Sequence, residues 1–307
     1  MMTGQGQTDV FIADATDRTG GLHAILGEFD LSVLSGAAVA LKANFNSDDP
    51  FPASTHIDML RGIAQSIMNE GPAHLTLAER SGMGETRTVL ENRGVFSLAH
   101  ELGFSVVVLD EIERNGWQEI QAPGLHWQRG FFIANVFTRA DRIIQTCCLK
   151  THRFGGHFTM SLKNSVGLIA KRVPGLDYDF MGELHTSPHQ RKMIAEINRF
   201  YPTDLVLMDA TEGFATGGPD KGKLIRPNVI IGGRDRVAID TTGVALLRSF
   251  GTSHDVSEGT IFSLEQIAHA AELGIGVTSA DQIRLVPLDA SSESVAEKIQ
   301  AQLDNEG

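Results

Sequence analysis

The stretch from Asp141 to Gly167 is the feature that most constrains the fold of this chain. It reads DRIIQTCCLKTHRFGGHFTMSLKNSVG. The β-branched residues near its start predict a strand, the paired glycines predict a tight turn, and the residues after His157 predict the start of a helix. A strand, a glycine-rich turn and a helix in this order are typical of an α/β protein that builds a pocket at the carboxyl edge of a strand.

This stretch carries more polar groups than a simple connection needs, namely Lys150, His152, His157, Lys163 and Asn164. Lys150 and His152 alternate at the predicted strand end, so both side chains could face one way. They suit an anion clamp or an acid–base pair, and a solvated strand end is the alternative. Lys163 and Asn164 follow the glycines at a helix start, which suits a phosphate or carboxylate, with a surface helix as the alternative.

Strands and helices alternate along the rest of the chain, which predicts an α/β fold with right-handed crossovers. The expected strands cover residues 10–13, 37–42, 74–79, 105–110, 204–209, 228–232 and 283–287. The expected helices cover residues 20–29, 56–69, 88–100, 188–200, 237–250 and 264–273, with a helical tail from 291. Shorter, antiparallel strands are expected within 116–134, a loop over 176–188 and a long turn over 211–222.

This order predicts two β-α-β halves with largely parallel sheets that share a central glycine-rich cleft. The N-terminal half covers residues 1–130, and the C-terminal half covers residues 131–307 and carries the Lys-Thr-His and Leu-Lys-Asn segments. The division rests on the β-rich segment between the two groups of alternating elements.

The composition narrows the classes of partner. The chain has 307 residues with a formal net charge of −12, so we expect it to bind neither nucleic acid nor anionic membranes. No run approaches 18 apolar residues, and residues 1–14 show no basic region followed by an apolar run. A cytoplasmic location is therefore the expectation.

The cysteines of the chain are the adjacent pair Cys147 and Cys148. On a strand their side chains point to opposite faces, so they cannot share a tetrahedral metal site. Two thiols are also too few for an iron–sulfur cluster. We expect them to be small buried core residues, dispensable for any metal content.

A second polar pair follows the early strand over 37–42. Lys42 and Asn44 come at its end, and the carboxyl ends of parallel strands meet at one sheet edge, so we expect both to join Lys150, His152, Lys163 and Asn164 in one pocket. Two lysines would repel each other there unless a carboxylate or a bound anion compensates.

Further site candidates are weaker. Gly155, Gly156 and Gly213 are expected on the substrate side of the cleft, with ordinary turns as the alternative. His152, His157, Asp209 and Asp240 are weak candidates for metal ligands, and the two aspartates could also compensate the lysines. Asp235 is expected to cap a helix. The isolated histidines, His126 among them, are expected to be structural.

Several separated motifs together resemble the domain of unknown function 362 (DUF362) family over roughly residues 10–287. They are Lys42-Ala-Asn44, Lys150-Thr-His152, Leu162-Lys-Asn164, Gly167, Val206-Leu-Met-Asp209, Gly213, Gly218-Pro219 and the segment from Asp235 to Asp240. The resemblance implies a fold class and a site location but no settled reaction. Many members carry ferredoxin-type cysteine motifs, and this sequence has none. A weaker, fold-level similarity is to lactate racemase and its relatives.

These observations favour an enzyme that binds a small anionic substrate, a carboxylate or phosphate, in a Lys/His/Asn cleft. Lys150, His152 and Lys163 would be its catalytic residues, with proton-transfer chemistry of an isomerase-like or metal-assisted kind. The alternative is a non-catalytic module that binds a cofactor, a metal or an iron–sulfur cluster, or a subunit that meets a redox partner protein. The cofactor, the substrate and the oligomeric state stay open.

Overall fold

The computed structural model describes residues 7–121 and 123–306 of the chain. Residues 1–6, part of the segment 1–14 on which the expected absence of a signal peptide rests, lie outside the described residues. The strands are β1 (Thr8–Asp14), β2 (Ala38–Lys42), β3 (His74–Glu79), β4 (Ser105–Val108), β5 (Trp117–Ile120), β6 (Phe131–Ala134), β7 (Arg142–His152), β8 (His157–Phe158), β9 (Leu205–Thr216), β10 (Lys223–Ile225), β11 (Val229–Gly233) and β12 (Ile283–Pro287).

The helices connect these strands and cover the sheet. They are α1 (Arg18–Leu26), α2 (Ile57–Asn69), α3 (Thr86–Asn92), α4 (Val95–Leu102), α5 (Asn135–Thr138), α6 (Ser161–Asn164), α7 (Phe180–Thr186), α8 (Gln190–Ile197), α9 (Arg236–Ser249), α10 (His254–Ser257), α11 (Glu265–Glu272) and α12 (Ala290–Leu303). No helix in the described part of the chain has both the length and the apolar character needed to cross a membrane.

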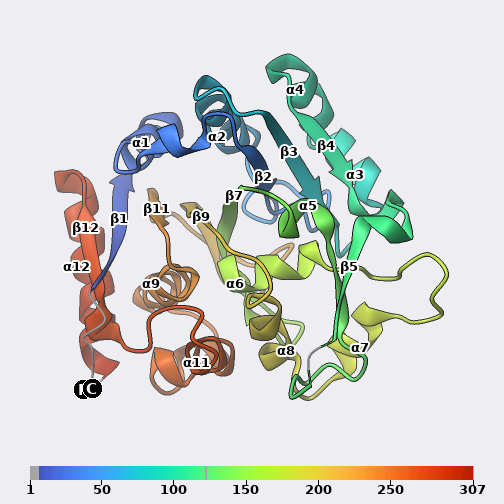
Figure 1. The fold of residues 1–307 in the computed structure, drawn as a ribbon. Coiled ribbons are helices and arrows are strands. Elements are labelled where there is room, and N and C mark those ends of the chain that lie inside the picture. Colours follow the sequence, from blue (N-terminus) through green and yellow to red (C-terminus); the bar gives the residue numbers. More distant parts are fainter. Residues whose placement is uncertain (1–6, 122, 307) are drawn as a thin grey trace, which may run out of the picture.

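One large, mostly parallel sheet runs through the molecule in the order β12-β1-β11-β9-β7-β2-β3-β4 (Figure 1). Within this order only β11 runs against its neighbours, β1 and β9. The short strands β10 and β8 extend β9 and β7 as antiparallel partners. The predicted α/β fold with a largely parallel sheet is therefore confirmed.

The order of strands reverses between β2 and β7. From β2 the chain moves outward through β3 to β4, whereas β7 leads the other way through β9. The connections thus leave β2 and β7 in opposite directions, and a crevice opens beyond their carboxyl ends. Lys42 is the last residue of β2 and His152 is the last residue of β7, so a polar residue lies on each side of this crevice.

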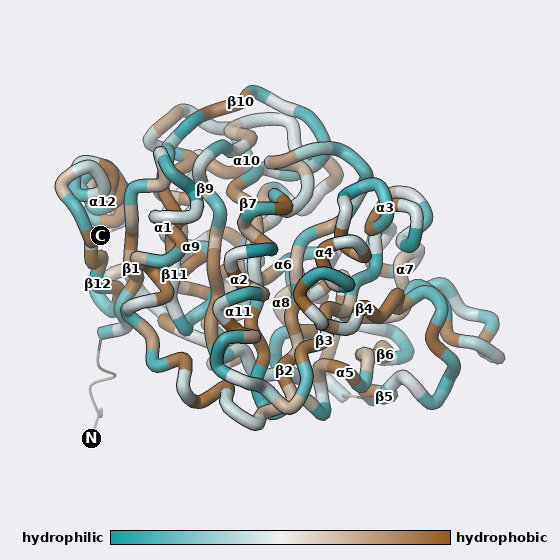
Figure 2. The backbone as a smooth tube through the Cα atoms, turned by 90° about the horizontal axis from the view of Figure 1, so that it is seen from above, coloured by the Kyte–Doolittle hydropathy of each residue, from teal (hydrophilic) through white to brown (hydrophobic). Residues whose placement is uncertain are grey.

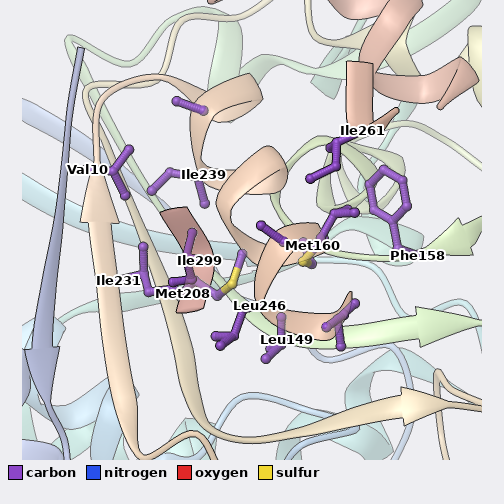
Figure 3. Packing of buried hydrophobic residues seen from close by; sticks show 14 of the residues in the cluster. Val10, Leu149, Phe158, Met160, Met208, Ile231, Ile239, Leu246, Ile261 and Ile299 are labelled. Carbon is purple, nitrogen blue, oxygen red and sulfur yellow. The ribbon is translucent and has the colours of Figure 1, made fainter. Parts of the chain in front are cut away.

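Alternating strand residues pack against helices on opposite faces of the sheet. In β9, Leu207 belongs to the core formed with α1, α2, α3 and α4, whereas Val206 and Met208 belong to the core formed with α9, α11 and α12. Figure 3 shows part of the second core, where Met208, Met160 and Leu246 meet between the sheet and α9. Hydropathy along the chain follows the same layering, with apolar strands inside and polar outer loops (Figure 2).

Two segments expected to be irregular form regular structure. The loop predicted over 176–188 contains α7, because the Asp179 side chain accepts a hydrogen bond from the Gly182 amide and caps a turn that buries Phe180 and Leu184. The first half of the turn predicted over 211–222 is strand, because β9 continues to Thr216 and pairs with β10.

One predicted helix is broken in two. The helix expected over 88–100 is divided into α3 and α4 at Gly94, whose positive φ of 75° favours glycine and interrupts the helical backbone. By contrast, the antiparallel strands expected within 116–134 are confirmed as the pair β5 and β6.

The sheet interleaves the two predicted halves. β1, from the N-terminal half, lies between β11 and β12 of the C-terminal half, and β7 lies beside β2. The boundary near residue 130 stays a prediction. If the chain were divided there, strands of each half would lose their sheet neighbours from the other half.

We therefore expect that residues 1–130 and residues 131–307, expressed separately, do not fold independently. Each fragment lacks sheet neighbours that the intact chain supplies, and exposed strand edges promote aggregation. Circular dichroism and amide hydrogen exchange on the two fragments, with the intact chain as control, check this. Cooperative unfolding of either fragment alone would contradict the prediction.

Candidate functional site

A cavity of about 540 Å³ lies at the carboxyl edge of the sheet, in the crevice beyond β2 and β7. It is lined by Lys42, Asn44, Asn46, Glu79, Arg80, Gly82, Met83, Lys150, His152, Phe154, Thr159, Lys163, Asn164, Val166, Gly167, Met181, His185 and Pro219. Six residues expected in one pocket, from two distant parts of the sequence, thus line the same cavity.

Lys42 forms a buried ion pair at the floor of this cavity. Its ammonium lies 2.6 and 2.7 Å from the two carboxylate oxygens of Glu79 and also donates to Asn164 Oδ1 at 3.0 Å. Both partners of the pair are about 1% exposed. Burial lowers the pKa of Lys42 and raises that of Glu79, and the attraction between them opposes both shifts. The charge of Lys42 is therefore compensated by the protein itself.

Lys150 is buried beside this pair but is held by neutral groups. Its ammonium donates to Asn44 Oδ1 at 2.6 Å and to the Ala53 carbonyl. It makes no ion pair with any described residue, and burial lowers its pKa. Two of the three ammonium N–H groups are used, so one stays available toward the cavity.

Lys163 and His152 lack hydrogen-bond partners for their reactive nitrogens. The Lys163 amine makes no hydrogen bond or ion pair to any residue that the structure describes, and the buried Nδ1 of His152 has no partner either. Burial, together with the charges of Lys150 and Arg80, lowers the pKa of Lys163 to about 8. Burial and the nearby lysines also hold the pKa of His152 well below its usual range, so its imidazole is neutral.

Arg80 adds a further buried cation that sequence analysis missed. Its guanidinium donates to the carbonyl oxygens of Ile169 and Val166, and burial lowers its pKa. At the rim, Phe154 is 51% exposed and its ring stands edge-on to His152. The cavity therefore combines several cations, one acid and an apolar rim, in a chain with a net charge of −12.

The three glycines expected on the substrate side do not line the cavity. Gly156 lies directly behind it, because an added Cβ would be 2.8 Å from His152 Nδ1 and 2.9 Å from Lys163 Cε. Gly155 has a positive φ of 80° and forms the turn. Gly213 lies in β9 against the Leu149 carbonyl. Gly156 is thus the one that makes room for the two unpartnered nitrogens.

The weak metal candidates His152, His157, Asp209 and Asp240 form no shared metal-binding group within the described ranges. Asp209 accepts a hydrogen bond from Arg18 at 2.8 Å. Asp240 accepts from the amides of Ser161 and Leu162 and so holds the start of α6. The carboxylate that compensates a lysine is therefore Glu79, not either aspartate.

The missed residues carried the same signal that identified Lys42. Glu79 and Arg80 are polar residues at the end of a predicted strand, β3, which lies beside β2. Applying the strand-end argument to every parallel strand would have found both. His185 comes from α7, which was expected to be a loop, so no pattern placed it.

Glu79→Gln should destabilise the protein by about 3–5 kcal/mol, because Lys42 would stay buried without a carboxylate. Chemical denaturation of the variant measures this. The double variant Lys42→Met/Glu79→Leu is the matched control and should recover much of the loss, since it removes both buried charges. Equal instability of the single and double variants would argue against the ion pair as the cause.

Lys163 should react with amine-directed reagents with a midpoint near pH 8, since only the neutral amine is nucleophilic and the folded pKa is about 8. Its labelling rate should rise through this pH, well below the model-peptide value of about 10.4. Mass spectrometry of digested samples measures it, with the exposed Lys223 as reference. A Lys163 profile that rises only above pH 10 would contradict the assignment.

No curated protein sequence matches the chain. One similar solved structure is the lactate racemase apoprotein from Thermoanaerobacterium thermosaccharolyticum, with 16% identity and a TM-score of 0.43. The match covers 68% of this chain and 51% of that one, so the chain spans about half the length of that structure. The sequence model of one protein family, the domain of unknown function DUF362, matches residues 39–245. The chain belongs to the DUF362 family.

Proposed function

We propose that the cavity binds a small organic anion and that Lys163 and His152 transfer a proton on it. The observation that carries the proposal is the Lys163 amine, which has a pKa of about 8 and no hydrogen-bond partner among the described residues, in one cavity with the neutral His152. Structural lysines are paired or exposed, whereas a cation held near its pKa in a cleft is typical of a functional site.

The charges of the cavity favour an anionic ligand. Glu79 compensates Lys42, but Arg80, Lys150 and Lys163 make no ion pair among the described residues. A carboxylate or phosphate would relieve the repulsion among these cations and accept charge-assisted hydrogen bonds, each contributing about 1.5–3 kcal/mol. We assign the anionic group to the side of Lys150 and Arg80.

The rest of the cavity suits a short carbon skeleton. Its volume of about 540 Å³ falls in the range of small-molecule sites. Apolar atoms of Met83, Val166 and Met181 line it beside the polar groups. A small carboxylate with a few carbons beyond its charged group would place its charge against the polar part of the lining and its carbons against the apolar part.

Lys163 is suited to accept and return a proton near neutral pH. With a pKa of about 8, roughly a tenth of it is neutral at pH 7, and the ammonium form is a competent acid. Burial, and after it the neighbouring cations, depress the pKa of His152; a bound anion offsets the second cause and so raises the basicity of this imidazole. Removal of a proton from carbon by one group and its return by the other is an isomerisation that needs no oxidant.

The proposal predicts exchange of carbon-bound hydrogen in D2O. Protein incubated with small 2-hydroxy, 2-oxo and 2-amino carboxylates should erase the C–H proton signal of at least one of them. Lys163→Met and His152→Gln should slow this exchange by about a hundredfold or more. Proton NMR measures the rates, and Lys298→Met on the exposed face of α12 is the control.

Binding measured on a variant of the anion side separates the two parts of the proposal. Lys150→Met, which removes a cation from the side assigned to the anionic group, should weaken binding of the carboxylate by roughly ten- to a hundredfold, without unfolding the chain. Binding without exchange would replace the enzyme by a non-catalytic carrier of a small anion. Failure of every carboxylate and of phosphate to bind in calorimetry would refute the anion site itself.

A further inference from the structure

A second cluster of ligating side chains lies outside the cavity. His126 from the connection between β5 and β6, Glu196 from α8 and His269 from α11 each present one ligand atom, and these atoms all lie within 4.8 Å of one another. None of the three lines the cavity. Helices α8 and α11 pack side by side, so the cluster joins three segments that are distant in the sequence (Figure 1).

Glu196 is a buried carboxylate surrounded by imidazoles. It is about 1% exposed, and its Oε1 lies 2.5 Å from Nδ1 of His126 and 3.4 Å from Nε2 of His269. Its other hydrogen bonds come from the His126 amide at 3.1 Å. No lysine or arginine of the described chain pairs with it. A buried carboxylate requires a compensating charge, and two histidines supply one only when protonated or when they share a cation with it.

The orientation of His269 favours a metal cation. Its Nδ1 lies 2.9 Å from a carboxylate oxygen of Glu272, which accepts a hydrogen bond when that nitrogen carries the proton. In this tautomer of the neutral ring the Nε2 lone pair faces the Glu196 oxygen at 3.4 Å, and a cation shared by the two acceptors would remove their repulsion. Metal-ligating histidines commonly donate their other ring nitrogen to a carboxylate in this way.

We propose that His126, Glu196 and His269 bind a divalent transition metal such as Zn²⁺. Two imidazoles and one carboxylate are a donor set for zinc or its neighbours rather than for Mg²⁺ or Ca²⁺. Ligand atoms of a tetrahedral zinc site lie ~3.3 Å apart, given bond lengths of about 2.0–2.1 Å. The present separations need only small side-chain movements to meet this.

A further histidine lies beside the cluster. The ring of His189, an exposed residue just before α8, lies 4.7 Å from the ring of His126, centroid to centroid. His189 or a water molecule would complete the coordination. The bound metal would tie the connection carrying His126 to α8 and α11, so its role is to stabilise this side of the fold.

The test uses the full chain, stripped with chelator and titrated with Zn²⁺ by calorimetry and with Co²⁺ by visible absorption. One equivalent should bind, with the Co²⁺ spectrum of a site with nitrogen and oxygen ligands. Glu196→Gln and His269→Gln should weaken binding by at least a hundredfold. Glu272→Gln, at a side chain that is 70% exposed, should weaken it by about ten- to a hundredfold while leaving the fold intact.

His254→Gln is the matched control. His254 is an exposed histidine at the start of α10, and it also faces a glutamate, Glu258, which follows the last residue of that helix. It should bind one equivalent as the parent chain does. Zinc should also raise the melting temperature of the parent chain and of this control, but not that of Glu272→Gln at the same concentration. The absence of stoichiometric uptake, or an affinity for Zn²⁺ that is equal in His269→Gln and the parent chain, would overturn the proposal.

Discussion

The buried ion pair between Lys42 and Glu79 is the interaction on which the site depends. It joins the carboxyl ends of β2 and β3, and the Lys42 ammonium also fixes Asn164 of α6. The Asn164 amide in turn donates to the Thr146 carbonyl in β7. Taking two charges out of water is costly, so such a pair is retained for position rather than for stability. Here it fixes three strands and α6 relative to one another at the place where the sheet reverses its order.

The pair also decides which cations remain for a ligand. Because Glu79 neutralises Lys42, the excess positive charge of the cavity belongs to Arg80, Lys150 and Lys163. Each is buried or partly buried. Burial, and after it the poorly screened charges of Lys150 and Arg80, lower the pKa of Lys163 to about 8. The same burial that excludes water from the cavity therefore prepares an amine that can exchange its proton near neutral pH.

The sequence was sufficient to predict those cavity residues that lie at or just after the ends of strands. Lys42, Asn44, Lys150 and His152 follow strongly apolar strands, and the rule that parallel strands place their carboxyl ends together was enough to bring them to one edge. Their roles in chemistry remain predictions.

Elements that form only through tertiary packing could not be predicted from the sequence. α7 arises because an aspartate cap and three buried apolar side chains outweigh its glycine and the nearby proline, and the extension of β9 depends on its pairing with β10.

The cluster of His126, Glu196 and His269 shows the same limit more sharply. No two of its members are close enough in sequence to form a recognisable spacing, and Glu196 by itself reads as a polar residue in an amphipathic helix. The packing of α8 against α11 buries its carboxylate beside the two imidazoles. Both clusters thus follow from one constraint: a charge that the fold removes from water must be met by another charge. We propose that in the cavity the buried cations are met by a bound anion, and that at the α8–α11 contact the carboxylate of Glu196 is met by a bound metal cation.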